Sequence, residues 1–197
     1  MKEAMRRSGM SPPNDEFRTP PEAVDPLLKY LYREGESYKS FFEAPGTWTS
    51  RPQVIWEPCC MAGGFSGIAD AFEAKGFEVI RTGVDYEAGF DFLLDKPNFY
   101  FDYIITNPPY SLKTEFIKRC YSIGYPWAML MPITALEGIE RGEMYRKRWL
   151  ELLVLDKRIQ FQKGKKGCWF NTSWFCHGVL PQRLMFAEVD GAGESYY

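Results

Sequence analysis

The 197-residue sequence has little histidine and no long apolar segment. Its single histidine, His177, lies in an apolar run, where a packed ring is expected rather than the base of a hydrolytic triad. No run approaches the roughly 20 apolar residues of a membrane-spanning helix, and the N-terminus lacks the apolar core of a signal peptide. These absences argue against triad hydrolysis and against a membrane partner, and they predict a cytoplasmic protein.

Cysteine is also scarce and shows no metal-binding spacing. The five cysteines form no Cys-x-x-Cys pair and their number is odd, so reduced thiols are expected and no metal site is predicted. The formal net charge of −2 does not indicate a nucleic-acid-binding protein. It does not exclude one either, because binding requires only a basic face.

The pattern along the chain predicts a polar N-terminal arm and one α/β domain. Residues 1–18 are polar and proline-containing and are predicted to be mobile, followed by a single domain over residues 19–197 without a separate recognition domain. A helical segment follows Thr19, and then strands such as QVIWEP, FEVIRTGVD, YFDYIIT and PWAMLMP alternate with helices; TSWFCHGVL reads as the last strand. Such alternation predicts a mostly parallel sheet with helices on both faces.

In such a sheet, ligands bind beyond the carboxyl ends of the strands, so the segments that follow the strands are informative. The segment WEPCCMAGGFSG places a turn with Gly63, Gly64 and Gly67 after a strand that ends at Glu57. Glycine allows the backbone to approach a ligand closely. The segment is either a ligand-binding turn or only a tight turn, and it does not match the Gly-x-Gly-x-x-Gly dinucleotide fingerprint.

Two carboxylates follow the next strand. Asp85 is predicted to close that strand, where it would accept hydrogen bonds from ribose hydroxyls. Asp91 and Phe92 come next, and together they offer an acceptor for an amino group and a flat face for an adenine ring. Asp91 taken alone could equally be a helix cap or a loop acid.

The segment TNPPY is the most informative of all. Asn107 follows an apolar strand and precedes Pro108, Pro109 and Tyr110. The side-chain oxygen of Asn107 and the carbonyl oxygen of Pro108 can accept hydrogen bonds from both hydrogens of one exocyclic amine. These two hydrogen bonds would stabilise the positive charge that develops on the nitrogen as it attacks. The prolines hold these acceptors without reorganisation, and Tyr110 would stack on the base.

A basic and aromatic region follows. It is either a nucleic-acid-binding face or a solvated helix and a lysine-rich turn. Its basic residues are Arg141, Arg146, Lys147, Arg148, Lys157, Arg158, Lys163, Lys165 and Lys166, interleaved with Tyr145, Trp149, Phe161, Trp169 and Phe170.

These motifs resemble those of S-adenosylmethionine-dependent DNA adenine-N6 methyltransferases of the small phage and prophage type, from about Phe17 to Leu180. TNPPY resembles their catalytic motif, EPCCMAGGFSG their Glu-Pro-x-x-Gly-x-Gly motif, and FRTPPEAV their N-terminal cofactor motif. The glycines come later after Glu57 than is usual. The cofactor-binding residues that the resemblance implies are Thr19, Pro20, Glu57, Pro58, Gly63, Gly64, Asp85, Asp91 and Phe92.

The resemblance implies a Rossmann-like methyltransferase fold with an antiparallel last strand, and methyl transfer from S-adenosylmethionine to flipped adenines in duplex DNA. The setting it implies is the cytoplasm of a bacterial or phage-infected cell. Alternatives are an RNA adenine or a protein glutamine amide as substrate, or a non-catalytic nucleic-acid-binding relative. Because little chain follows Leu180, we expect a short or relaxed target sequence, or recognition supplied by a homodimer or a partner protein.

Overall fold

The computed structural model describes residues 18–31, 53–85, 89–161 and 170–190, together with the backbone of strands β1 (Tyr38–Lys39) and β2 (Trp48–Thr49), which pair antiparallel. Except for Arg18, the N-terminal arm lies outside these residues. Within the described part of the chain, no helix combines the length and the apolar character needed to cross a membrane.

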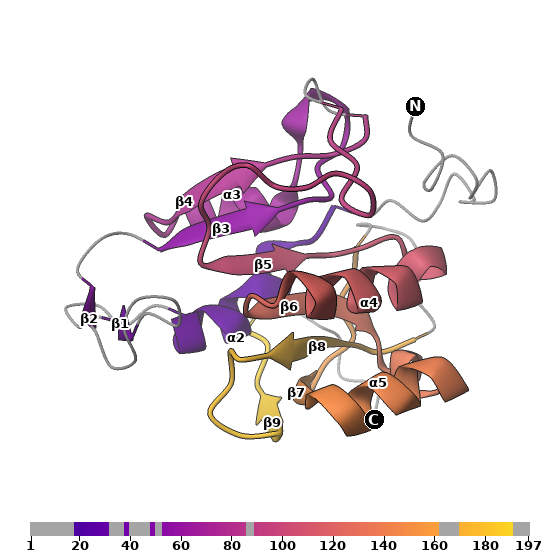
Figure 1. Cartoon of the computed structure of the whole chain (residues 1–197). Helices are drawn as coiled ribbons and strands as arrows, with labels where there is room; N and C mark the ends of the chain where they lie inside the picture. The colour runs from indigo at the N-terminus through magenta and orange to yellow at the C-terminus, as the bar shows by residue number, and fades with distance from the viewer. Residues whose placement is uncertain are drawn as a thin grey trace.

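Seven strands form one sheet in the order β4-β3-β5-β6-β8-β7-β9 (Figure 1). Strand β8 is antiparallel to both of its neighbours, while all other pairs are parallel, so a single strand runs against the rest. The strands are β3 (Val54–Glu57), β4 (Glu78–Arg81), β5 (Tyr103–Thr106), β6 (Trp127–Pro132), β7 (Glu151–Leu155), β8 (Thr172–His177) and β9 (Leu184–Ala187).

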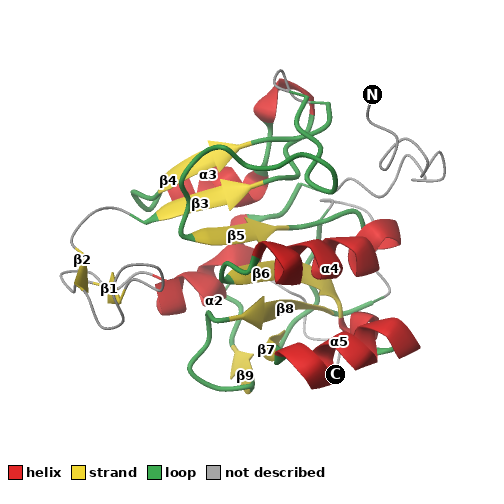
Figure 2. Cartoon of the chain, in the orientation of Figure 1, coloured by secondary structure: helices red, strands yellow, loops and turns green. Residues whose placement is uncertain are grey.

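Helices cover both faces of this sheet, as the alternating pattern predicts (Figure 2). Residues of α2 and α3 share one buried core with the sheet, and residues of α4 share the other. All six residues of β6 are buried, as expected for a central strand between two helical layers. The helices are α2 (Pro21–Leu31), α3 (Gly67–Glu73), α4 (Lys113–Ile123) and α5 (Ile139–Arg148), with short turns η1 (Ala62–Gly64), η2 (Tyr110–Leu112) and η3 (Ile133–Leu136).

This arrangement confirms the expected Rossmann-like α/β fold, with two differences in the strands. The segment TSWFCHGVL is not the last strand, because β9 follows it and pairs with β7 at the edge of the sheet. Strand β4 ends at Arg81, so Asp85 lies in the turn after the strand and does not close it.

Candidate active site

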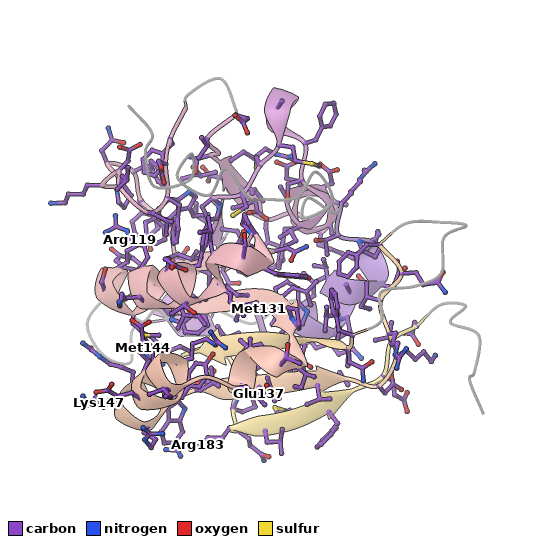
Figure 3. All side chains as sticks on the ribbon, turned by 90° about the vertical axis from the view of Figure 1, so that its right-hand side faces the viewer. Arg119, Met131, Glu137, Met144, Lys147 and Arg183 are labelled. Atoms are coloured by element: carbon purple, nitrogen blue, oxygen red, sulfur yellow. The ribbon has the colours of Figure 1, made fainter. Side chains whose placement is uncertain are left out.

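A pocket opens where β3, β4 and β5 end, at the carboxyl edge of the parallel strands. Figure 3 looks toward this edge of the sheet. The position is the one expected for a ligand site in an open α/β sheet. The lining residues are Arg18, Thr19, Glu57, Pro58, Cys59, Cys60, Met61, Phe65, Ser66, Gly67, Ile68, Gly83, Val84, Asp85, Asn107 and Pro109.

Two glycines allow the walls of this pocket to lie close together. A Cβ on Gly67 would lie 1.9 Å from the carbonyl oxygen of Thr19, and a Cβ on Gly83 would lie 2.1 Å from that of Cys60. Gly63 and Gly64 instead form the turn η1 with positive φ angles, and they do not line the pocket. The structure therefore brings Gly67, rather than the two glycines expected from the motif, to the pocket.

Glu57 joins three segments at the base of the pocket. Its buried carboxylate accepts hydrogen bonds from the backbone N–H of Cys59 (2.8 Å), the hydroxyl of Thr106 (2.6 Å) and the hydroxyl of Ser66 (3.1 Å). Burial raises the pKa of Glu57 to about 7, although these hydrogen bonds favour the charged form. The carboxylate thus links the ends of β3 and β5 to Ser66, whose hydroxyl caps α3.

Asn107 presents a buried acceptor that no residue in the described part of the chain pairs with. Its Nδ2 donates a hydrogen bond to Thr19 Oγ1 (3.2 Å), which fixes the orientation of the amide. Its Oδ1 is buried, and no described residue donates a hydrogen bond to it. Buried acceptors in folded proteins are nearly always paired, so an orphan beside a pocket suggests that a ligand completes it.

Around Asn107, the other residues of TNPPY are arranged as follows. Pro109 lines the pocket, whereas Pro108 is buried beside it. Tyr110 begins η2, and its ring meets that of Phe170 edge-on, with centroids 5.6 Å apart. Two of the expected base-contacting rings therefore lie together, although they are far apart in the sequence.

The expected adenosine-binding residues fall in different environments. Asp85 is exposed at the mouth of the pocket. Asp91 is buried; its Oδ1 accepts the N–H of Leu93, and its Oδ2 has no partner among the described residues. Phe92 is fully buried and stacks on Phe116 at 4.9 Å, so its ring offers no open face to a ligand in this conformation. Neither Asp91 nor Phe92 lines the pocket.

Those basic residues of the expected nucleic-acid face that the structure describes are dispersed. The guanidinium of Arg141 is engaged internally, donating to the carbonyls of Ala135 and Glu137 and to Thr114 Oγ1. Arg146, Lys147 and Arg148 occupy the last turn of α5. Lys147 pairs with Glu143, and Figure 3 labels it at the lower left of the molecule. The predicted residues Lys163, Lys165, Lys166 and Trp169 lie outside the described residues.

The end of α5 lies at the opposite edge of the sheet from the pocket. The carbonyl of Trp149, which follows the helix, accepts a hydrogen bond from Tyr121 and contacts the ring of His177. His177 ends β8 and pairs with Trp127, the first residue of β6. Arg146, Lys147 and Arg148 therefore do not join the pocket, in contrast to the single basic face that the sequence suggested.

Three features of the site escaped the sequence analysis: the anchoring of Glu57 by Thr106 and Ser66, the pocket-lining Gly83, and the hydrogen bond from Asn107 to Thr19. Thr106 directly precedes Asn107, and Ser66 carries the signature of a helix cap, so local sequence offered hints for those two. Across the part of the chain that the structure describes, no three His, Cys, Asp or Glu side chains are grouped to hold a metal ion.

Comparison with known proteins supports the fold. No protein family and no curated protein matches the sequence. Among solved structures, the chain is similar to a class I S-adenosylmethionine-dependent methyltransferase, so described, from Listeria monocytogenes (TM-score 0.54, 13% identity, 89% of this chain and 67% of that one). It also matches a protein described as a modification subunit of a type I restriction enzyme from Vibrio vulnificus YJ016 (TM-score 0.48, 12% identity, 98% of this chain) and spans 51% of that protein's length. At this level of identity the likeness concerns the fold alone.

Proposed function

We propose that this protein transfers a methyl group from S-adenosylmethionine to the exocyclic N6 amine of adenine in DNA. The observation that carries the proposal is the buried Oδ1 of Asn107 at the edge of the pocket, which accepts no hydrogen bond from any described residue. A hydrogen bond to Thr19 orients this amide, and two prolines follow it. An acceptor held in this way is suited to hydrogen-bond an amine while the amine nitrogen attacks the methyl group.

Several residues that line the pocket suit the proposed cofactor. The close approach of the backbone at Gly67 and Gly83 makes a narrow cradle, and the exposed carboxylate of Asp85 at its mouth is suited to ribose hydroxyls. Asn107 and Thr19 line the same pocket, so the methyl donor and the acceptor amine would meet beside them. When bound, S-adenosylmethionine supplies an electrophilic methyl group on a sulfonium.

Asn107 is the residue that would act on the substrate amine. Its Oδ1 and the carbonyl oxygen of Pro108 would accept hydrogen bonds from the two N6 hydrogens and favour a pyramidal nitrogen. The lone pair of this nitrogen would form the new N–C bond as the S–CH3 bond breaks, with S-adenosylhomocysteine as the leaving group. The methylated amine is then acidic enough to lose its proton to water, so no histidine base is required. The rings of Tyr110 and Phe170, which contact each other, would support the extruded base in the site.

The test is methyl transfer from labelled S-adenosylmethionine to duplex DNA, RNA and a protein extract, followed by nucleoside analysis. We expect label in DNA as N6-methyladenine. Label confined to RNA or protein would refute DNA as the substrate. Absence of S-adenosylmethionine binding in calorimetry would refute the proposal that the protein is a methyltransferase. Direct readout of DNA requires several side chains placed in a groove, and Arg18 is the one basic residue among the described residues that line the pocket. We therefore also propose a short or relaxed target sequence, which sequencing of the methylated DNA would reveal.

Replacing Thr19 with valine tests how the amide of Asn107 is oriented. Valine has a similar shape but no acceptor, so the Asn107 amide would lose the hydrogen bond that points Oδ1 toward the substrate. We expect kcat to fall about tenfold, because misplaced reacting groups slow the chemical step. Rescue by Thr19→Ser, which restores the hydroxyl, separates this role from a packing defect; equal losses in both variants would contradict it.

A further inference from the structure

Strand β9 forms one edge of the sheet, at the bottom of Figure 1. It pairs in parallel with β7, with Leu184 beside Leu152 and Ala187 beside Leu155. In the part of the chain that the structure describes, no strand pairs with its other side. An open edge of this kind is a template for another strand.

The outward side of β9 is formed by two particular residues. The carbonyls of Arg183 and Ala187 accept hydrogen bonds from Leu152 and Asp156 of the β7 segment (2.8 and 3.1 Å). Backbone groups of alternate residues along a strand point to alternate sides. Leu184 and Phe186 therefore direct their N–H and C=O groups toward the open edge.

The same two residues also expose their side chains. Leu184 is 53% exposed and Phe186 is 72% exposed, whereas Met185 and Ala187 pack against the core formed with α2 and α3. Exposed apolar side chains on an open edge strand are normally avoided, because they favour pairing between chains. A strand that paired with this edge could therefore bond to the backbone of Leu184 and Phe186 and contact their side chains.

We propose that a second copy of this chain pairs antiparallel with β9 about a two-fold axis through Met185. This register sets Leu184 opposite Phe186 of the second copy, on the same face of the sheet, and joins both residues by paired backbone hydrogen bonds. A shift of two residues in one direction would set Leu184 against Glu188, and a shift in the other would set Phe186 against Gln182. Only the register centred on Met185 pairs apolar residues twice.

Charge complementarity favours the same occupant. The strand begins after the exposed Arg183, whose guanidinium lies over the ring of Trp149 (3.4 Å), and the exposed carboxylates of Glu188 and Asp190 follow its end. Antiparallel pairing brings the positive start of one strand toward the negative end of the other, whereas parallel pairing would align like charges. Neither carboxylate forms an ion pair with another described residue.

The association does not depend on the proposed methyl transfer, and it is weak. Four residues of edge pairing bury little surface, so we expect a dissociation constant on the order of 10⁻⁴ M. Sedimentation of the full chain should therefore show a monomer–dimer equilibrium as its concentration passes through this range. A monomer at all concentrations up to several times that value would overturn the proposal.

Matched charge substitutions locate the interface. Phe186→Lys is expected to raise the dissociation constant at least tenfold, whereas Ile139→Lys, at a 93% exposed residue on α5, should leave it unchanged. Circular dichroism checks that both variants are folded. Persistence of the dimer in Phe186→Lys, or its loss in Ile139→Lys, would place the interface elsewhere and refute the pairing.

Engineered cysteines test the register. In a hydrogen-bonded antiparallel pair the Cα atoms lie about 5.5 Å apart, which suits a disulfide. A mixture of Leu184→Cys and Phe186→Cys chains should give a disulfide-linked dimer under mild oxidation, and each variant alone should give much less. Equal cross-linking by either variant alone would refute the register centred on Met185.

Discussion

Asn107→Ala is expected to lower the rate of methyl transfer by a factor on the order of 10²–10³, by analogy with the loss of one preorganised hydrogen-bond partner in an active site. The substitution removes the buried Oδ1 of Asn107, a pocket-lining residue, and no described residue donates a hydrogen bond to this oxygen. Cofactor affinity should change little, because Oδ1 would meet the substrate amine. Single-turnover kinetics and calorimetry measure the two quantities separately.

Two further variants make this result specific. Asn107→Asp keeps an oxygen acceptor and should retain more turnover than the alanine variant. Asp85→Ala should show the opposite pattern, with weaker cofactor binding and a smaller loss of turnover at saturating cofactor, since Asp85 lies at the mouth of the pocket. Near-normal turnover in Asn107→Ala would remove the role assigned to this residue.

The layered fold and the location of the site follow from local sequence patterns. Apolar runs that alternate with helices predict parallel strands, and the carboxyl ends of such strands must lie at one edge. Glu57 and Asn107 were therefore expected at the same edge, where the structure places them. The short β9 was missed because two of its four residues are exposed, so it shows no continuous buried run.

Two features could not be predicted in the same way: contacts between residues far apart in the sequence, and the edge or face of the sheet at which a residue lies. The bond between Thr106 and Glu57 joins residues 49 positions apart, and no local pattern encodes it. The sequence places Arg146 and Arg148 near the site, but a helix of ten residues carries the chain about 15 Å, from one edge of the sheet toward the other. Phe92 stands between Asp91 and Leu93, and this local pattern does not reveal whether its ring faces a ligand or the core.

Glu57→Gln is expected to change how the stability of the protein depends on pH. The pKa of Glu57 is raised to about 7 from its ordinary value of 4.5, mainly because burial disfavours the charged carboxylate. Between these two values the folded protein keeps a proton that the unfolded chain has lost. The stabilisation from this proton is therefore fully present below pH 4.5 and is lost as the pH rises through 7.

The glutamine side chain has nearly the same shape but does not titrate, so the difference between the two proteins isolates Glu57 from every other titrating group. Relative to Glu57→Gln, the wild-type free energy of unfolding should fall by about 3 kcal/mol as the pH rises from 4.5 to beyond 7. Urea unfolding of both proteins across this range provides the measurement. Parallel profiles would mean that the Glu57 carboxylate, with its hydrogen bonds to Thr106, Ser66 and Cys59, is as stable when charged inside the protein as in water.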